Sequence, residues 1–324
     1  MPLSPAPDVL VVGGGIAGLT AALALGDAGR VVLVLDERRP GAASRASAGM
    51  LGASLGFDAA TARQAAAARD RYPALVARLL EDTGIAVPLD RSGIVEVGDD
   101  GEPVALHPLD GFVDAPPLMD ALTTAAIRHP RVSLTADAVA RIGASGGGGF
   151  VATEAGDRHE ARHVVVATGA WASQVAGLPR ALPVRPLRGE LLTLAAAPPP
   201  RAMYGCGGYL IPRGGEVLVG ATSVDDGFAP RTTPEGRAAL LRIADRLAGL
   251  AEAPVTAHWS GLRPMSPDAL PILGVDPAHP WLAYAAGLSR NGILFAPWAA
   301  DQLAAELDGA RVAALDPFRM ARFG

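Results

Sequence analysis

Three glycines at fixed spacing carry the most specific chemical signal in the sequence. Gly13, Gly15 and Gly18 form a G-x-G-x-x-G pattern near the start of the chain. In such a turn the first glycine permits a sharp bend, the second lets the backbone approach a pyrophosphate, and the third allows a helix to pack closely on a strand. The pattern therefore predicts a phosphate-binding turn. Ile16 and Ala17 stand where the amides and the dipole of a helix N-terminus attract phosphate groups.

The residues around this turn give it the context that a nucleotide site needs. An apolar run at 8–12 precedes it, apolar residues at helical spacing continue through Leu25, and a second apolar run at 31–35 ends at Asp36, next to Glu37. This order predicts one βαβ unit. A carboxylate at the end of the second strand accepts a hydrogen bond from a ribose hydroxyl, so we predict a dinucleotide site rather than a purely structural turn.

Two other motif matches predict no site. The range 143–147 fits the G-x-S-x-G pattern of hydrolases, but a nucleophile elbow needs a helix directly after its serine, and here further glycines follow. His159 and His163 fit the zinc-protease pattern, yet they lead into the strand-like run 164–167. Histidines four residues apart on a strand lie ~13 Å apart, too far to share a metal. We expect a hairpin tip, solvated histidines and no metal.

Composition excludes several classes of protein. The 324 residues include 28 basic and 33 acidic ones, and half of the chain is apolar, which is typical of a globular enzyme and not of a nucleic-acid-binding protein. All basic residues are arginine, so no lysine can form a Schiff base or serve a Walker-type loop. The single cysteine, Cys206, excludes a disulfide framework and fits a reducing compartment. Without a membrane span or room for a signal peptide before the first strand, we expect a cytoplasmic protein.

The elements that must position these residues alternate in the manner of an α/β protein. Strand-like runs and helical patterns at 58–83 (interrupted by Pro73) and 116–127 follow the βαβ unit, and the end of the chain returns to a strand at 281–286 and a helix to about 307. Between them, antiparallel strand patterns accompany an amphipathic helix at 234–248. We predict a Rossmann-type doubly wound domain with an inserted, mainly antiparallel substrate domain. The nucleotide domain comprises 1–83, 113–182 and 261–324, and the substrate domain 84–112 and 183–260.

Six motifs stand in an order that resembles the D-amino-acid oxidase superfamily of flavoproteins, most closely its glycine oxidases of thiamine biosynthesis. Besides the glycine-rich turn, they are the small-residue segment 44–51, Ala167-Thr-Gly-Ala-Trp171, Tyr209-x-x-Pro-Arg213, Gly261-Leu-Arg-Pro264 and Gly287-x-x-Arg-Asn-Gly-Ile293. The resemblance covers nearly the whole chain. It implies FAD, bound non-covalently in the doubly wound domain, because covalent attachment in related enzymes needs a cysteine near 261–268 and none is present.

The resemblance also assigns residues to the site. It implies that the ADP half is bound by Gly13, Gly15, Gly18 and Asp36, that the flavin ring lies beside Ser44, Ala48, Gly49 and Met50, and that Thr168 and Gly169 form a second signature. Asn291, Gly292 and Ile293 would lie near the flavin pyrimidine, where helix amides stabilise negative charge. Tyr209, Arg263 and Arg290 would bind and orient the substrate. Arg45 and Ser47 depart from the family pattern and predict a more polar edge facing the flavin.

The implied reaction is the oxidation of glycine or a similar small amine or amino acid. The neutral amine would transfer a hydride from its Cα to flavin N5 and become an imine, and dioxygen would reoxidise the flavin with formation of hydrogen peroxide. No side-chain acid or base is required, because the cofactor performs the redox chemistry. A D-amino-acid or N-methyl-amine dehydrogenase with another electron acceptor, and a non-catalytic flavin-binding protein, remain alternatives. The native substrate and a homo-oligomeric state stay open.

Overall fold

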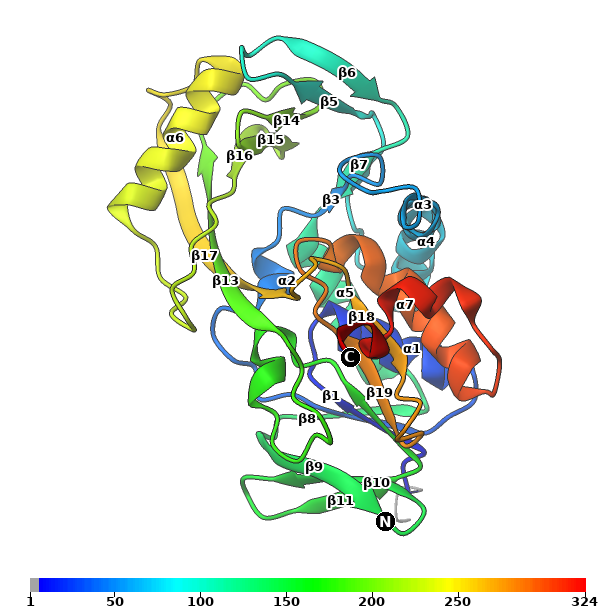
Figure 1. Cartoon of the computed structure of the whole chain (residues 1–324). Coiled ribbons are helices and arrows are strands. Elements are labelled where there is room, and N and C mark those ends of the chain that lie inside the picture. The colour runs from blue at the N-terminus through cyan, green and yellow to red at the C-terminus, as the bar shows by residue number, and fades with distance from the viewer. Residues whose placement is uncertain (1–5) are drawn as a thin grey trace.

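The computed structural model describes residues 6–324, and its first layer is a six-stranded sheet (Figure 1). The strand order is β18-β19-β12-β1-β2-β8, and all pairings are parallel except that of β18 with β19. The strands are β1 (Val9–Val12), β2 (Val32–Leu35), β8 (Val132–Thr135), β12 (His163–Val166), β18 (Ile272–Val275) and β19 (Leu282–Ala286). Nearly all of their side chains are apolar and buried, as expected for a sheet covered on both faces.

Helices cover one face of this sheet, and a small sheet covers the other. The helices that contact the sheet are α1 (Ile16–Asp27), α5 (Ala115–Arg128) and α7 (Gly292–Leu307), and α3 (Ala62–Asp70) and α4 (Tyr72–Thr83) pack on α7 and α5. The apolar residues of these helices form one core with alternate residues of β1 and β2. The opposite face packs against β9 (Val139–Ser145) and β10 (Gly148–Thr153), which pair with β11 (Arg158–Ala161), and against the 3-10 helix η1 (Gly169–Gln174). Two further 3-10 helices, η2 (Ala313–Phe318) and η3 (Met320–Phe323), follow α7.

A second, seven-stranded sheet curves away from the first layer (Figure 1). Its order is β17-β13-β16-β15-β14-β5-β6, and every pairing but β14 with β5 is antiparallel. The strands are β5 (Ile94–Val97), β6 (Pro103–His107), β13 (Arg185–Leu194), β14 (Ala202–Gly205), β15 (Gly208–Arg213), β16 (Glu216–Gly220) and β17 (Val255–Met265). Helix α6 (Pro234–Ala248) packs its apolar side chains on the outer face of this sheet.

A second small sheet joins the two layers. It contains β3 (Met50–Leu51), β7 (Gly111–Val113) and β4 (Leu89–Asp90), and the short helix α2 (Ala43–Ala46) lies just before it in the chain. The small-residue segment 44–51 therefore includes most of α2 and all of β3. These elements are too short for periodicity to identify them.

Most of the longer elements agree with their predictions. Helix α6 has the predicted bounds, and the helical pattern at 58–83 is divided at Arg71, with Pro73 in the first turn of α4. The G-x-S-x-G match lies in the β9–β10 hairpin, and the two histidines of the zinc-like match lie on strands β11 and β12. The predicted domain boundaries stay a prediction; the one before residue 261 falls within β17. No helix in residues 6–324 is long and apolar enough to cross a membrane.

Candidate active site

A cavity of about 1430 Å³ is lined by residues of both large sheets. Apart from Gly18, it is lined by every residue predicted for the site: Gly13, Gly15, Ile16, Ala17, Asp36, Glu37, Ser44, Ala48, Gly49, Met50, Thr168, Gly169, Tyr209, Arg263, Arg290, Asn291, Gly292 and Ile293. These residues come from distant parts of the sequence and line the same cavity. Its volume exceeds the ~300–1,000 Å³ of ordinary small-molecule pockets, as an extended cofactor together with a substrate requires.

The glycine-rich turn has the geometry that its spacing predicts. Gly13 has a φ of +108°, and a β-carbon there would overlap the carbonyl oxygen of Ala167. A β-carbon on Gly18 would overlap the carbonyl oxygen of Gly13, so Gly18 lies beneath the turn and outside the cavity. Gly18 thus lets α1 begin close to β1, whereas the space beside Gly15 is restricted only by Ser44 Oγ, 3.1 Å from an added β-carbon.

Backbone amides without a hydrogen-bond partner among the described residues lie at the start of α1. Within residues 6–324, the N–H groups of Gly14, Gly15 and Ala17 donate to no protein acceptor, while that of Ile16 donates to Ser44 Oγ at 3.0 Å. Free amides at a helix N-terminus form an anion-binding site. The carboxyl group of Asp36 lies beside Gly14, 2.8 Å from the position of an added β-carbon. This part of the cavity therefore offers amide donors for phosphates and one carboxylate for a hydroxyl.

Ser44 has a contact that the sequence did not indicate. We expected it beside the flavin, and it does line the cavity, but its hydroxyl also accepts the first amide of α1 from 28 residues away. The departures at Arg45 and Ser47 likewise form bonds within the protein. Arg45 pairs with Asp120 at 2.6 Å, and Ser47 Oγ accepts the amide of Gly49 at 3.1 Å. Both still line the cavity.

Two side chains of the seven-stranded sheet hold the small-residue segment in place. Trp259 Nε1 donates to the carbonyl oxygen of Ala46 at 3.1 Å, and Arg213 Nη2 donates to that of Ala48 at 2.9 Å. Arg213 also pairs with Asp114 at 3.3 Å. The sequence analysis did not identify Trp259 and assigned no role to Arg213. No sequence signal identifies such contacts, because the partners are far apart in the chain.

The opposite wall holds the second signature and the start of α7. Asn291 is the N-cap of α7, so Gly292 and Ile293 form the first turn, whose amides have no intrahelical partner. Thr168 lines the same cavity, and its buried Oγ1 has no hydrogen-bond partner in the described part of the chain. A buried polar atom without a hydrogen-bond partner destabilises the folded protein, so we expect a polar group of a ligand in the cavity to bond to the Thr168 hydroxyl.

Two guanidinium groups line one end of the cavity, near Tyr209. Arg263 Nη1 donates to the carbonyl oxygen of Thr222 at 2.9 Å, and Arg290 Nη2 donates to Ser223 Oγ at 3.2 Å. The segment after β16 therefore orients both arginines. Within residues 6–324, Arg263 forms no ion pair with a carboxylate.

Burial is the largest influence on the pKa values of Arg263 and Tyr209 at this end of the cavity. It lowers the pKa of Arg263, an effect that the nearby Tyr209 opposes and Arg290 reinforces. Arginine nevertheless keeps its charge, because the pKa of a guanidinium is so high. Burial raises the pKa of Tyr209, opposed by the charges of Arg263, Arg213 and Arg290. Tyr209 is thus a neutral hydroxyl beside the half-buried positive charge of Arg263, which pairs with no carboxylate of residues 6–324, and this arrangement favours an anionic ligand.

The residues present fit FAD. The free amides at the start of α1 match a pyrophosphate, and the carboxylate of Asp36 matches a ribose hydroxyl. The small side chains of the segment 44–51, which Arg213 and Trp259 hold in place, leave space for a flat ring system. The amides that begin α7 could donate to the ring. Cys206 is not among these residues, since its thiol is buried in the core between α6 and the seven-stranded sheet and contacts the carbonyl oxygen of Gly98 at 3.3 Å.

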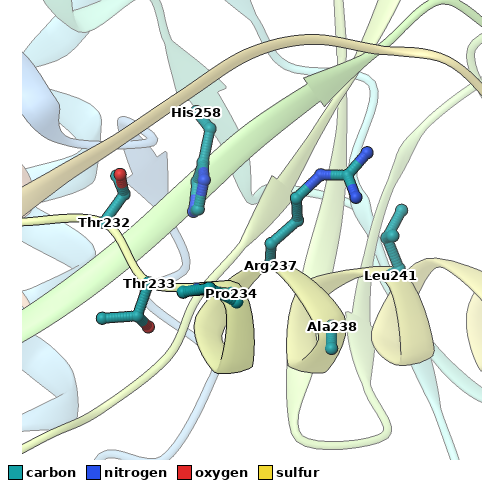
Figure 2. Close-up of a pocket in the computed structure, with 7 residues that line it drawn as sticks. All are labelled: Thr232, Thr233, Pro234, Arg237, Ala238, Leu241 and His258. Atoms are coloured by element: carbon teal, nitrogen blue, oxygen red, sulfur yellow. The ribbon is translucent and has the colours of Figure 1, made fainter.

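A smaller pocket of about 410 Å³ lies between α6 and β17 (Figure 2). His258 and Arg237 project into it from opposite sides, and Thr232 and Thr233 line its end near the start of α6. His258 Nε2 lies 2.9 Å from the carboxylate of the fully buried Glu190. None of the residues predicted for the site lines this pocket, whereas all of them except Gly18 line the larger cavity.

Comparisons with known proteins agree with this geometry. The model of the family described as FAD dependent oxidoreductase (DAO) matches residues 8–107 and 103–306. A glycine oxidase of Geobacillus kaustophilus is 33% identical over 341 residues, covering 90% of each chain, and one of Pseudomonas aeruginosa is 31% identical, covering 95% of this chain and 96% of that protein. The crystal structure of glycine oxidase from Geobacillus kaustophilus superimposes with a TM-score of 0.91 at 30% identity, covering 98% of this chain and 99% of that one.

Proposed function

The chain belongs to the family of FAD dependent oxidoreductases, and from this premise we propose that it oxidises glycine or a similarly small amino acid to the imine. One observation carries the proposal. The guanidinium of Arg263 is half-buried in the wall of the cavity, donates to the Thr222 carbonyl, and has no carboxylate partner among the described residues. An amino-acid carboxylate would supply the missing negative charge.

The side chains at this end would bind and orient the substrate. Arg263 presents parallel N–H donors that match a carboxylate, and Tyr209 adds a hydroxyl that stays protonated. Fixing the carboxylate fixes the direction of the Cα–H bond, and this orientation is the main contribution that the protein makes to the rate. Bound FAD would supply the hydride acceptor, and dioxygen would then restore its oxidised form with release of hydrogen peroxide.

The other residues would hold the cofactor. The amides of Gly14, Gly15 and Ala17 would donate to the pyrophosphate, and Asp36 would accept from the ribose. The first turn of α7 would direct its amides and the positive end of its dipole toward the flavin ring, where they would favour the reduced, negatively charged form. We also propose a cytoplasmic location, because the single cysteine is buried as a free thiol, which fits a reducing compartment.

Anaerobic mixing tests the proposed function. The purified yellow protein is mixed with glycine, sarcosine or D-alanine in the absence of oxygen, and the flavin absorbance is followed. We expect bleaching with at least one small amino acid, and peroxide in stoichiometric amount when air is admitted. Bleaching without peroxide would favour the dehydrogenase alternative. If amines without a carboxylate bleach the flavin as well as amino acids do, the role of Arg263 is wrong.

A further inference from the structure

Helix α7 contains a proline where its first turn needs a hydrogen-bond donor. In an α-helix the carbonyl of residue i accepts the amide of residue i+4, so the carbonyl of Ile293 would accept from residue 297. Residue 297 is a proline inside the helix, and proline has no N–H. The proline ring also crowds the carbonyl four residues before it and turns that carbonyl outward. The second residue of α7 is therefore left with a carbonyl that the helix cannot satisfy.

A buried tyrosine from another helix supplies the missing donor. The hydroxyl of Tyr72, the first residue of α4, donates to the carbonyl oxygen of Ile293, 221 residues away in sequence. The side chain of Tyr72 is completely buried in the core shared by α3, α4 and α7. Tyr72 lies between Arg71, which separates α3 from α4, and Pro73 in the first turn of α4. Burial raises the pKa of Tyr72, so its hydroxyl stays protonated and remains a donor.

The hydrogen bond from Tyr72 to Ile293 restrains a part of the cavity wall, the first turn of α7. Ile293 and Gly292 line the cavity and form the turn whose unpaired amides face it. A peptide unit is planar, so a bond to the Ile293 carbonyl fixes the plane that this carbonyl shares with the amide of Leu294, and this restrains the first turn to which Gly292 and Ile293 belong. Without the hydroxyl, a buried carbonyl would lack any partner, and the turn would gain by moving toward one.

We infer that Tyr72 is a positioning residue: it replaces the donor that Pro297 lacks and thereby holds the first turn of α7 in the orientation in which its amides meet the cofactor. The inference rests on the proposed function for the identity of that cofactor. It does not require Tyr72 to touch the cofactor or the substrate, and Tyr72 does not line the cavity.

A pair of substitutions tests the inference through rescue. Tyr72→Phe removes the hydroxyl and keeps the ring, whereas Pro297→Ala restores an amide donor to the Ile293 carbonyl. Hydrogen exchange of peptides spanning 291–299 is measured in the protein without FAD, and the Kd for FAD is then measured by titration. Tyr72→Phe should speed exchange in this segment and raise the Kd about tenfold, the effect of one unsatisfied buried acceptor. The double variant should return to the exchange and the Kd of the Pro297→Ala protein.

Tyr284→Phe is the matched control. Tyr284 is also fully buried, and its hydroxyl donates to Asp276 at 2.7 Å on the far side of the sheet from α7's first turn, away from the cavity lining. This variant should leave the exchange of 291–299 and the Kd for FAD unchanged. If Tyr72→Phe behaves like this control, or if Pro297→Ala does not rescue it, the inference is wrong. If Tyr72→Phe does not fold, the double variant should still fold, and its failure would overturn the inference. A failure of the unmodified protein to bind FAD would instead overturn the proposed function.

Discussion

The guanidinium of Arg263 lies directly over Gly189, so that a β-carbon on Gly189 would overlap its Nη1, Nη2 and Cζ atoms. Arg263 is on β17 and Gly189 on the paired strand β13, so the absence of a side chain on one strand makes room for the planar group of the other. Tyr209 lies in the same way over Gly220 of β16. Two glycines of the seven-stranded sheet therefore form the floor on which the proposed substrate-binding groups rest.

The first prediction concerns this floor. Gly189→Ala should displace the Arg263 guanidinium from the Thr222 carbonyl and lower kcat/KM for glycine about tenfold or more, since a small misplacement of an orienting group has a large effect on rate. FAD should remain bound. Gly146→Ala is the control, because Gly146 lies in the β9–β10 turn and an added β-carbon there meets no atom within 4 Å. Unchanged kinetics of the Gly189 variant would show that the position of Arg263 does not matter.

A second prediction concerns the guanidinium itself. Arg263→Lys keeps the charge but loses the two parallel donors, so kcat/KM for amino acids should fall by about 2 kcal/mol, or about 30-fold. A simple amine without a carboxylate should be affected much less. Two measurements decide whether Arg263 binds substrate or has a structural role: steady-state kinetics with both substrates, and the amount of flavin bound to the variant. Equal losses for both substrates, or loss of flavin, would assign Arg263 a structural role.

The third prediction is a pH profile. Burial raises the pKa of Tyr209 above its ordinary value of about 10, which means that the folded protein favours the protonated hydroxyl. Tyr209 therefore does not titrate between about pH 6 and 10, and Tyr209→Phe should lower kcat/KM for glycine about fivefold by removing one hydrogen bond while leaving the shape of the profile unchanged. An alkaline limb in the native profile that disappears in the variant would contradict this assignment.

The predicted parts of the site are those governed by local rules. The glycine-rich turn, the position of Asp36 and helix α6 could be predicted because strand, turn and helix signals lie next to one another in the sequence. The resemblance located Tyr209, Arg263 and Arg290 in the same way, by short motifs. The contacts of Ser44 with Ile16 and of Trp259 with Ala46 could not be predicted, since the partners are 28 and 213 residues apart. Such contacts depend on how the layers pack, which periodicity does not describe.

The fourth prediction is that FAD is not covalently bound. The cavity lining contains no cysteine, and Cys206 is packed on the far face of the seven-stranded sheet against α6. Acid precipitation of the purified protein should therefore release all of the flavin into the supernatant, where its absorbance and fluorescence identify it as FAD. Yellow colour that stays with the precipitated polypeptide would require attachment through another side chain and would contradict the prediction.

The last prediction separates two glycines of the same motif. At Gly15 the φ of −73° is accessible to any residue and only Ser44 Oγ is near, so Gly15→Val should fold with nearly native Tm but bind no FAD, because its side chain enters the space where the pyrophosphate would lie. At Gly18 a methyl group would overlap the Gly13 carbonyl, so Gly18→Ala should lose about 2 kcal/mol of stability even without cofactor. Thermal unfolding of the two FAD-free proteins, together with FAD titration of each, measures both effects. A Gly15→Val protein that binds FAD as tightly as the native chain would mean that the turn does not contact the phosphates, and a stable Gly18→Ala protein would mean that α1 can move away from β1 at little cost.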